Sequence, residues 1–579
     1  METEKRLIIA IAASVLILVV FSWLAPKRQP APPPEQPVVS GEQFEPTEES
    51  RPTPSIDAEE EAEAAPPIEA EMAVAAETEQ EVRVDAGLIE VVLTNRGGRA
   101  LTWTLQHYTT SDGAPLQLFP QFVDQKERPM AIDLDDRSLA DLLNDALYTV
   151  ERKKLSSGGS RTSGERITFA WSDGRGLSAE KTYEFREGSY LVDVGVEVLD
   201  RGRRLPARLT LGPGFAAQEP SSSHSNYYYE SQAVWDVASR VTRTKKGKLD
   251  PEGGFSGPAY WAGLEDQYFT SLILPHDAQA RVHWRHLDLI PIPVDGEEAQ
   301  EAPEPVSTPI LAVSIPDGGG QIFIGPKQYD LLKAQGSDLE KAVWFSSQDW
   351  LRVIVKYLFF CLVWIHDNVT GNWGLAIVLA TLVLRIVLFP INQYSMVKMK
   401  RTQLDMQRLA PKINAIKNKY KKNKDAQSRS KMNQETMELY KKEGINPMGG
   451  VSGCLPLLAQ FPILIGFYNM LTVAVELRGA PFFGWIQDLS QEDPYMVLPI
   501  LMAITMFAQQ KLAMSKIKDP QQLQQQRMML FMPIVFGFIC LQMPSGLVLY
   551  WFVNNLLGMG QQWLVNRHAA RLEAATQKA

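Results

Sequence analysis

The sequence predicts an α-helical membrane protein with six spans that also carries a separate all-β sandwich domain. Between residues 82 and 326, apolar and polar residues alternate in short runs bounded by Gly, Asp, Ser and Pro, which is typical of strands. After residue 370 there are apolar stretches close to the roughly 20 residues that a helix needs to cross a bilayer. Hydrophobic residues make up 45% of the chain, but this average describes neither half.

Residues 1–25 contain the first predicted span. Leu7–Leu24 is an apolar run that follows Lys5 and Arg6, so it is either a signal peptide or an uncleaved anchor. The run is longer than a usual signal core of roughly 7 to 15 residues, and no clear small-x-small cleavage site follows it. We therefore expect a membrane anchor.

Residues 26–81 are expected to form a disordered linker. The segment 29–80 contains 14 Asp or Glu, ten Pro and a single base, Arg51, and Phe44 is its only aromatic residue. Such a composition cannot bury enough apolar surface to form a packed core.

Residues 82–343 are predicted to form the all-β domain. Runs that fit strands lie at 89–94, 166–171, 190–198, 207–211, 311–315 and 321–324. Residues 327–343 fit a short helix that leads toward the membrane.

Residues 344–370 are expected to form an interfacial amphipathic helix. The apolar run Leu351–Ile365 is short for a span and contains Arg352 and Lys356. An additional span here would also place the basic segment that follows on the wrong side of the membrane.

Residues 371–566 contain the other five predicted spans, followed by a cytoplasmic tail at 567–579. The spans are 373–391, 454–475, 495–512, 528–543 and 547–565. If the N-terminus is cytoplasmic, the first two spans return the chain to the cytoplasm just before the segment 393–449, which has 14 Lys or Arg against five acids. The positive-inside rule supports this topology, with both termini cytoplasmic and the β domain on the other side.

The basic segment 393–449 is predicted to be a cytoplasmic helical hairpin. Apolar residues repeat with helical spacing up to about Pro411 and again from Met432 to Tyr440, and Lys-rich residues 417–431 join the two helices. The hairpin either anchors the chain to anionic lipid or docks a nascent chain or ribosomal RNA, and its charge permits both.

Arg385 is the main candidate for a functional residue. It lies in the apolar span 373–391, and none of the five spans after residue 370 contains an acidic residue that could neutralise it. An arginine at the centre of a span costs about 2.5 to 3.5 kcal/mol on insertion scales, so it normally faces a cavity, a ligand or another polar group.

Other polar side chains are predicted at a similar depth in the cytoplasmic half. They are Thr381, Gln460, Gln509, Gln510, Asn554, Asn555, Gln561 and Gln562, whereas Asn469 and Gln542 lie nearer the outside. These groups could form a hydrogen-bonded lock between helices or line a hydrated cavity. Because Arg385 lacks an acid, we expect water as its partner and a cavity that opens to the cytoplasm.

Several other functions find no support in the sequence. The three cysteines, Cys361, Cys454 and Cys540, lie in apolar segments and fit neither a disulfide nor a zinc framework. The glycine-rich pieces at Gly253 and Gly318 lack the Lys-Ser/Thr of a phosphate-binding loop. We expect no metal, no cofactor, no DNA partner and no enzymatic activity.

The C-terminal half resembles the YidC branch of the YidC/Oxa/Alb family of membrane-protein insertases. The resemblance rests on GNWGLAIVLATLVLRIVLFPI, PLLAQFPILIGFYNML, ELRGAPFFGWIQDLSQEDPYMVLPILM and MPSGLVLYWFVNNL, which cover much of 371–565. The N-terminal anchor and large β domain look like the Gram-negative form. Trp551 departs from the more familiar Tyr, and Gln542 stands where an aromatic residue is expected.

The resemblance implies a periplasmic β-supersandwich, a five-helix conserved core, and a location in the bacterial inner membrane. It implies insertion and folding of nascent membrane proteins, alone or with the Sec translocon, through a hydrophilic groove open to the cytoplasm. By resemblance, Arg385 receives the substrate, Thr381 and Gln460 line the groove near it, and Tyr550 and Trp551 contact substrate helices. Asn554 is added to this set because of its depth.

Two other classes of function are weighed against insertion. A solute transporter should show internal repeats, paired broken helices or intramembrane carboxylates, and the five C-terminal spans show none of these clearly. A sugar-processing enzyme could use the β domain, which contains His107, His224, His276, His283 and His286. Histidines scattered over such a domain are more often surface or core groups than a site.

Overall fold

The structure is a computed structural model. It describes residues 73–578 except 111–112, 121, 123–126, 156–162, 216–230, 238–239, 277–278, 291–305, 316–318, 347, 421–424, 444–454 and 515–519. The predicted anchor at 1–25 and most of the predicted linker lie outside the described residues.

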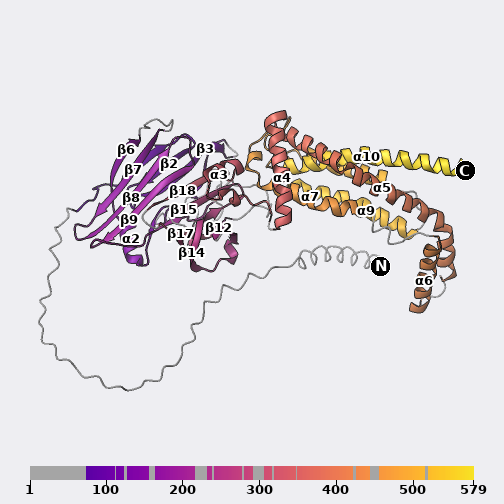
Figure 1. The fold of residues 1–579 in the computed structure, drawn as a ribbon, viewed down its shortest axis with the longest axis horizontal. Helices are drawn as coiled ribbons and strands as arrows, with labels where there is room; N and C mark the ends of the chain where they lie inside the picture. The colour runs from indigo at the N-terminus through magenta and orange to yellow at the C-terminus, as the bar shows by residue number, and fades with distance from the viewer. Residues whose placement is uncertain are drawn as a thin grey trace, which may run out of the picture. The chain divides into compact units, whose positions relative to one another are not determined.

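The all-β domain contains two sheets, and every strand pairing described in them is antiparallel. The smaller has four strands in the order β1 (Glu81–Asp85), β2 (Ile89–Thr94), β3 (Arg99–Thr109) and β4 (Pro115–Gln117). The larger has 14 strands, with the main order β5-β11-β17-β16-β14-β15-β18-β9-β8-β7-β6 (Figure 1). These antiparallel sheets support the predicted sandwich.

The strands of the larger sheet have the following bounds. They are β5 (Ile132–Asp133), β6 (Thr149–Leu155), β7 (Gly164–Ser172), β8 (Leu177–Arg186), β9 (Leu191–Asp200), β10 (Arg203–Arg204), β11 (Arg208–Leu211), β12 (Gln232–Val237), β13 (Arg240–Lys245), β14 (Glu252–Glu265), β15 (Phe269–Pro275), β16 (Gln279–Leu289), β17 (Val306–Ser314) and β18 (Gly319–Pro326). The short helix α2 (Arg137–Asp145) connects β5 and β6.

Strand β14 joins two parts of the larger sheet. Its first half, Glu252–Pro258, pairs with β16, and its second half pairs with β12 and β15. A strand that changes partners in this way turns a corner between two layers. Gly257 and Pro258 lie where β14 changes partners. Gly257 adds backbone freedom, and Pro258 lacks the backbone N–H that a central strand would donate.

The β domain begins earlier in the chain than the sequence indicates. Val74 and Ser172 form an antiparallel bridge, and the N–H of Ala76 donates to the carbonyl of Leu147. Residues 73–81 were predicted to belong to the linker. Their local composition is acidic, but Val74 pairs with Ser172, the last residue of β7, beyond Thr149 where β6 begins.

Alternation explains the core of this domain. In β1 the even positions Val82 and Val84 are buried and the odd positions are exposed. In β8 the same period buries Ala179, Lys181, Tyr183 and Phe185. Period-two burial on facing sheets builds a continuous apolar core, and Lys181 is a cation within it.

The ammonium of Lys181 is completely buried and is held by backbone carbonyls. It donates to Gly97 O at 2.9 Å, to Gly98 O at 2.8 Å, and to Met130 O. Burial, with a smaller contribution from the charge of Arg99, lowers the pKa of Lys181, whereas three accepting carbonyls favour the ammonium form. Lys181 therefore ties β8 to the β2–β3 turn of the smaller sheet.

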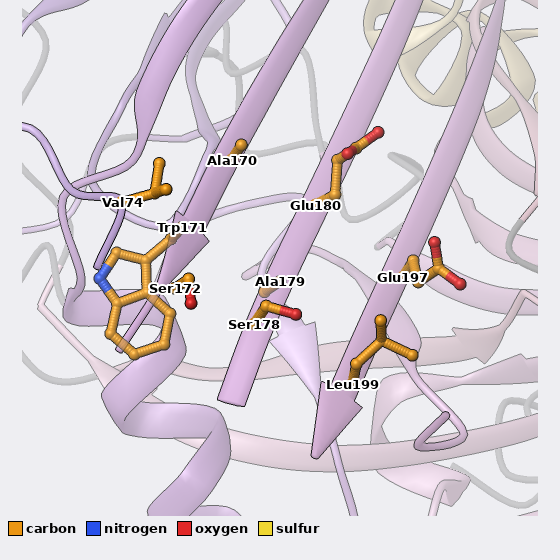
Figure 2. A pocket seen from close by; sticks show the side chains of 9 residues that line it. All are labelled: Val74, Ala170, Trp171, Ser172, Ser178, Ala179, Glu180, Glu197 and Leu199. Atoms are coloured by element: carbon orange, nitrogen blue, oxygen red, sulfur yellow. The ribbon is translucent and has the colours of Figure 1, made fainter. Parts of the chain in front are cut away.

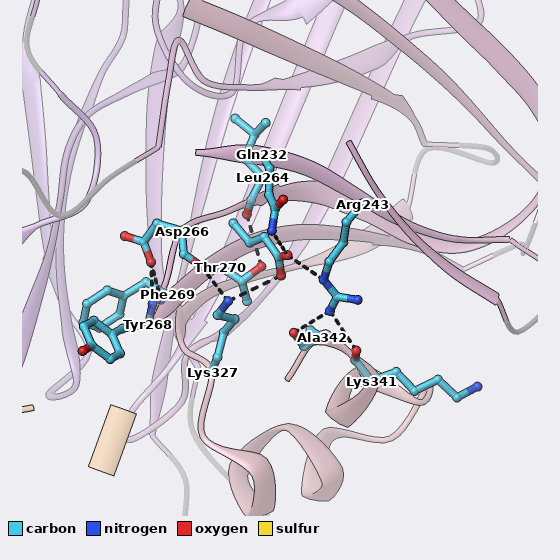
Figure 3. A network of polar contacts seen from close by, with 11 residues as sticks. Gln232, Arg243, Leu264, Asp266, Tyr268, Phe269, Thr270, Lys327, Lys341 and Ala342 are labelled. Atoms are coloured by element: carbon cyan, nitrogen blue, oxygen red, sulfur yellow. Dashed lines mark hydrogen bonds and ion pairs between the residues drawn. The ribbon is translucent and has the colours of Figure 1, made fainter. Parts of the chain in front are cut away.

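A second buried charge network fixes the end of the β domain (Figure 3). The carboxylate of Glu265 is fully buried and accepts from Arg243 Nε at 2.7 Å and Gln232 Nε2 at 2.8 Å. Lys327 lies 3.6 Å from the other oxygen of Glu265. Arg243 Nη2 also donates to Lys341 O and Ala342 O in η3 (Leu339–Ala342). Helices α3 (Tyr329–Gln335) and η3 are thus docked on the sheet where residues 327–343 were predicted to be helical.

Helix α4 (Asp349–Ile365) continues as a π-helix, His366–Thr370. Its buried stripe contains Leu351, Val355, Phe359, Leu362 and Ile365. The combined helix of 22 residues has a mean hydropathy of 1.4, so it is long and apolar enough to cross a membrane. The apolar run in the sequence ends at Ile365, but the helix continues for one π turn beyond it, so the helix is longer than the run. An interfacial position for residues 344–370 remains a prediction.

The helical core consists of long helices whose bounds differ slightly from the predicted spans. They are α5 (Trp373–Lys419), α6 (Ala426–Lys442), α7 (Leu455–Val473), α8 (Val497–Ala513), α9 (Pro520–Ile539) and α10 (Ser545–Lys578), with short 3-10 turns η6 (Val475–Leu477) and η7 (Cys540–Gln542). Besides α4, the segment Trp373–Thr402 passes the length and hydropathy criterion for a span among the described residues. The count of six spans remains a prediction.

Helix α5 joins the predicted span and the first helix of the hairpin without a break. It contains Pro390 and Pro411 and ends at Lys419, beyond the stop expected near Pro411. Leu409 and Ile413 are buried on either side of Pro411, and this packing offsets the lost backbone hydrogen bond. Antiparallel α6 is held to α5 by ion pairs from Lys412 to Glu443, at 2.5 Å, and from Lys419 to Glu435, at 2.6 Å.

Polar contacts also join the β domain to the helices. Gln267 Nε2 donates to Thr472 O on α7 at 2.6 Å, and Asn469 Nδ2 donates to Phe345 O at 3.2 Å. The guanidinium of Arg478 lies over the rings of Tyr268 and Phe269. Asn469, whose depth separated it from the other polar residues in the spans, therefore belongs to this junction.

Candidate functional site

Arg385 lies on α5 and binds α10 through Asn554. Its Nε donates to Asn554 Oδ1 at 2.8 Å, and its Nη2 donates to the backbone carbonyl of Asn554 at 2.7 Å. The arginine is half-buried. We expected water as its partner, but the structure provides an amide oxygen and a helix carbonyl, so two helices are linked at this point.

The two bonds use only part of the guanidinium. Arginine has five N–H donors, so three remain after the bonds to Asn554. Within the described ranges, neither another hydrogen-bond acceptor nor a carboxylate is paired with these three donors. One edge of the guanidinium is therefore fixed to α10, and the N–H donors of its other edge are bound by no described group.

Two residues outside the predicted set pack against this pair. A Cβ added to Gly558 on α10 would lie 3.0 Å from Arg385 Nη2 and 2.3 Å from Gln509 Nε2 on α8. Helices α5, α8 and α10 thus meet at Gly558. Gln509 was noted in the sequence for its depth, but Gly558 was missed. Its signal is a small residue one turn after Asn554, the residue type that allows close approach of membrane helices.

Thr381 is fully buried one turn before Arg385 on α5. Its hydroxyl donates to Ile377 O of the preceding turn at 2.6 Å, which is the usual bond of a Thr inside a helix. It shares the helix face of Arg385, but its proton is already used.

The predicted aromatic pair on α10 lies inside the helical bundle. Tyr550 is fully buried, and its ring stacks on Phe467 of α7 with 4.3 Å between centroids. Trp551 packs edge-on against Phe536 of α9 at 4.7 Å. The Tyr550 hydroxyl has no hydrogen-bond partner among the described residues. The pair is close to the Arg385 turn, with Tyr550 four residues before Asn554.

Among the remaining polar residues Gln561 contacts another helix, whereas Gln562 donates to Asn566 of its own helix at 3.1 Å and Gln510 Oε1 has no hydrogen-bond partner among the described residues. Gln561 Nε2 lies 3.5 Å from Phe389 O on α5, and Asn566 Nδ2 donates to Leu512 O on α8 at 2.9 Å. These contacts match the hydrogen-bonded lock that the sequence left open as an alternative. Gln460 lies on α7, but its side chain is outside the described residues.

A hollow of about 490 Å³ lies on the face of β7, β8 and β9 (Figure 2). Its lining includes the indole of Trp171 and the exposed carboxylates of Glu180 and Glu197. His224 lies outside the described residues, and none of the domain's other four histidines lines the hollow. In the part of the chain that the structure describes, no group of three His, Cys, Asp or Glu residues could hold a metal ion.

Two family models match this chain. The model of the YidC periplasmic domain matches residues 81–361, and that of the 60Kd inner membrane protein matches residues 364–572. The membrane protein insertase YidC of Syntrophus aciditrophicus is 32% identical over 594 residues, covering 98% of this chain and all of that protein. The chain belongs to the YidC family of insertases. A second YidC, from Geobacter metallireducens, is also 32% identical and covers 99% of this chain and 100% of that protein.

The YidC family is also represented among solved structures. A crystal structure of an active YidC insertase with its first transmembrane domain resolved covers 84% of this chain and 93% of that chain, with 19% identity and a TM-score of 0.33. The two family models identify the β domain as periplasmic and the helical part as an inner-membrane protein. Both agree with the resemblance found in the sequence.

Proposed function

We propose that this YidC-family insertase receives the polar, acidic flank of a nascent membrane protein at the unused edge of Arg385. The proposal rests on one observation, the three N–H groups of a half-buried guanidinium that have no partner among the described residues. A client carboxylate could accept from two of them in the bidentate geometry that arginine favours. No covalent step is needed.

The physical task of an insertase is to lower the cost of moving a polar tail through lipid. We propose that Arg385 and nearby polar groups hold water in a groove open to the cytoplasm, which shortens the dry path for the tail. The apolar segment of the client gains about 25 cal/mol per Å² removed from water. It would move into lipid along the third and sixth predicted spans, which correspond to α7 and to the first part of α10.

The other predicted site residues take supporting roles in this proposal. Gln460 and Asn554 line the groove, and Thr381, which is fully buried, joins its lining when the helices move apart. Tyr550 and Trp551 contact the client helix. Because Tyr550 is stacked on Phe467 and Trp551 packs on Phe536, a client reaches these rings only when α7 or α9 moves. Motion of these helices is therefore part of the proposed cycle.

The topology and partners also belong to the proposal. We propose six spans with both termini in the cytoplasm, so that Arg385 and the hairpin of α5 and α6 face the side where clients are made. The chain would insert some clients alone and others beside the Sec translocon. The basic hairpin would bind anionic lipid or ribosomal RNA, and its charge supports both partners.

The test is insertion by the full chain in reconstituted vesicles. The client is a single-span protein with a short acidic tail, and its matched form has each tail Asp or Glu replaced by the amide. Arg385→Ala should reduce insertion of the acidic client by roughly tenfold or more, the value of a charged hydrogen bond. It should affect the amide client much less, and Arg385→Lys should restore part of the loss.

Arg240→Ala is the matched control, because Arg240 is an exposed arginine on β13 of the β domain, outside both the proposed groove and the basic hairpin. It should behave like the unaltered chain. If the Arg385→Ala chain inserts both clients as well as the unaltered chain does, the proposal is wrong. Photo-crosslinkers at Thr381, Gln460 and Tyr550 should capture the acidic client during insertion.

A further inference from the structure

The contact between Arg385 and α10 has an unusual partner. Arg385 Nη2 reaches the main-chain carbonyl of Asn554 at 2.7 Å inside a continuous helix. A helix carbonyl is normally occupied by the N–H four residues later and shielded by the side chain there. Here the residue four positions later is Gly558, which has no side chain.

The space above Gly558 is filled by groups from two other helices. A Cβ at this position would lie 3.0 Å from Arg385 Nη2, 2.3 Å from Gln509 Nε2 and 3.1 Å from Gln509 Cδ. Gly560, two residues later on the same helix, would have no heavy atom within 4 Å of an added Cβ. The close approach is therefore specific to Gly558.

We infer that Gly558 positions Arg385 for its client, while Gln509 of α8 fills the rest of the space above this glycine. The missing side chain at Gly558 lets the guanidinium bind both oxygens of Asn554, and this two-point contact sets which N–H groups remain for the client. Glycine weakens a helix relative to alanine. Gly558 therefore lowers the stability of α10 but allows Arg385 to approach the carbonyl of Asn554. This inference rests on the proposed role of Arg385.

An alanine at Gly558 would have a defined effect. Its methyl group would displace the Gln509 amide and push Arg385 Nη2 away from the Asn554 carbonyl by a few tenths of an ångström. The Nε bond to Asn554 Oδ1 could persist as a pivot. The guanidinium would then turn, and its unused edge would no longer be held in one direction.

The experiment compares Gly558→Ala with Gly560→Ala in the full chain, using the acidic and amide clients in vesicles. Both changes add one methyl group and raise helix propensity equally. Gly558→Ala should lower insertion of the acidic client roughly three- to fifteen-fold, the range of hydrogen bonds between membrane helices. It should leave the amide client unchanged, and Gly560→Ala should affect neither client.

Two further variants separate positioning from packing. Gln509→Ala removes the atoms closest to the added methyl group, so Gln509→Ala with Gly558→Ala should recover most of the lost insertion. Gln509→Glu adds no volume but places a carboxylate beside Arg385, so it should compete with an acidic client and reduce its insertion alone. The Gln509→Glu result stands even if Gly558→Ala does not fold.

The outcomes distinguish this inference from the proposed function. If Arg385→Ala has no effect on the acidic client, the proposed function fails, and this inference fails with it. If Arg385→Ala impairs insertion while Gly558→Ala and Gln509→Glu behave like the unaltered chain, only the positioning role is wrong. An equal loss for both clients that the double variant does not recover would mean ordinary packing and would also overturn the inference.

Discussion

Lys181 in the β domain and Arg385 in the helical core are both cations in apolar surroundings with no paired carboxylate among the described residues. Lys181 donates to three backbone carbonyls, which matches the three N–H groups of an ammonium. Arg385 donates to one carbonyl and one side-chain oxygen, which leaves three of its five donors. Lys181 is fully buried, whereas Arg385 is half-buried.

The difference separates a structural cation from one available for binding. A buried cation whose donors are all satisfied stabilises the chain segments around it, and removing it leaves carbonyls without donors. A partly exposed cation with unused donors adds less to stability and can accept a ligand. The comparison therefore predicts opposite outcomes for stability and insertion at the two positions.

The largest effect is expected for Lys181→Met. Methionine has a similar volume, but the carbonyls of Gly97 and Met130 would lose their donor, whereas Gly98 O would keep its bond from the Tyr183 hydroxyl at 2.8 Å. Two unsatisfied buried carbonyls should lower the free energy of unfolding of the β domain by about 2 to 4 kcal/mol. Hydrogen exchange of the β3 and β8 amides in the detergent-solubilised full chain measures this loss.

Lys153→Met is the control for that change, because Lys153 is exposed on β6. It should alter stability by less than about 0.5 kcal/mol. If the Lys181→Met chain is as stable as the control, the three carbonyls do not depend on the ammonium. The claim that Lys181 is a structural cation would then be wrong.

An intermediate effect on the free energy of unfolding is expected for Glu476, an acidic residue in η6. Burial, together with the nearby charge of Asp330, raises the pKa of Glu476 from 4.5 to about 7, although a backbone hydrogen bond opposes the shift. Between these two pH values the folded chain holds a proton that the unfolded chain has released. The free energy of unfolding should therefore fall as the pH rises from about 4.5 to about 7 and then level off.

Glu476→Gln should remove this pH dependence. The difference between the two chains should be on the order of 1 to 2 kcal/mol over that range, after allowance for the exposed part of the side chain. Thermal unfolding of both chains at pH 5 and pH 8 measures it. A stability difference that does not change with pH would mean that Glu476 is ionised throughout.

The smallest effect on stability is expected for Arg385→Ala. Hydrogen bonds between membrane helices contribute about 0.6 kcal/mol on average, so the helical core should lose about 1 kcal/mol or less while insertion of acidic clients falls. Unfolding of the solubilised chain, measured beside the vesicle assay, gives both quantities. If Arg385→Ala lowers the free energy of unfolding as much as Lys181→Met does, Arg385 is a structural residue and does not differ from Lys181 in this respect.

Much of the fold could be predicted from local patterns. Period-two alternation indicated the all-β domain, and the uninterrupted apolar runs indicated helices that the structure has as α5 and α7 to α10. The boundaries were less predictable because they depend on distant partners. Residues 73–81 look like linker until Val74 meets Ser172, and Pro411 looks like a helix stop until Leu409 and Ile413 are buried around it.

The candidate site could be predicted only in part. An arginine without an acid in an apolar run identified Arg385, and depth suggested Asn554 as a neighbour. Depth did not reveal which atoms meet, because rotation of each helix about its axis is set by packing against the others. Hence Gly558 was missed, and the used hydroxyl of Thr381 and the stacked ring of Tyr550 could not be foreseen.

By itself the sequence determined the two-part architecture, the family resemblance and the one charge that apolar surroundings make costly. These depend on composition and on residues close together in the chain, where the physics is local. Only the tertiary structure decided which donors of that charge are used. Hydrogen bonds between α5 and α10 join residues 169 positions apart, and their geometry depends on the close approach of three helices at Gly558.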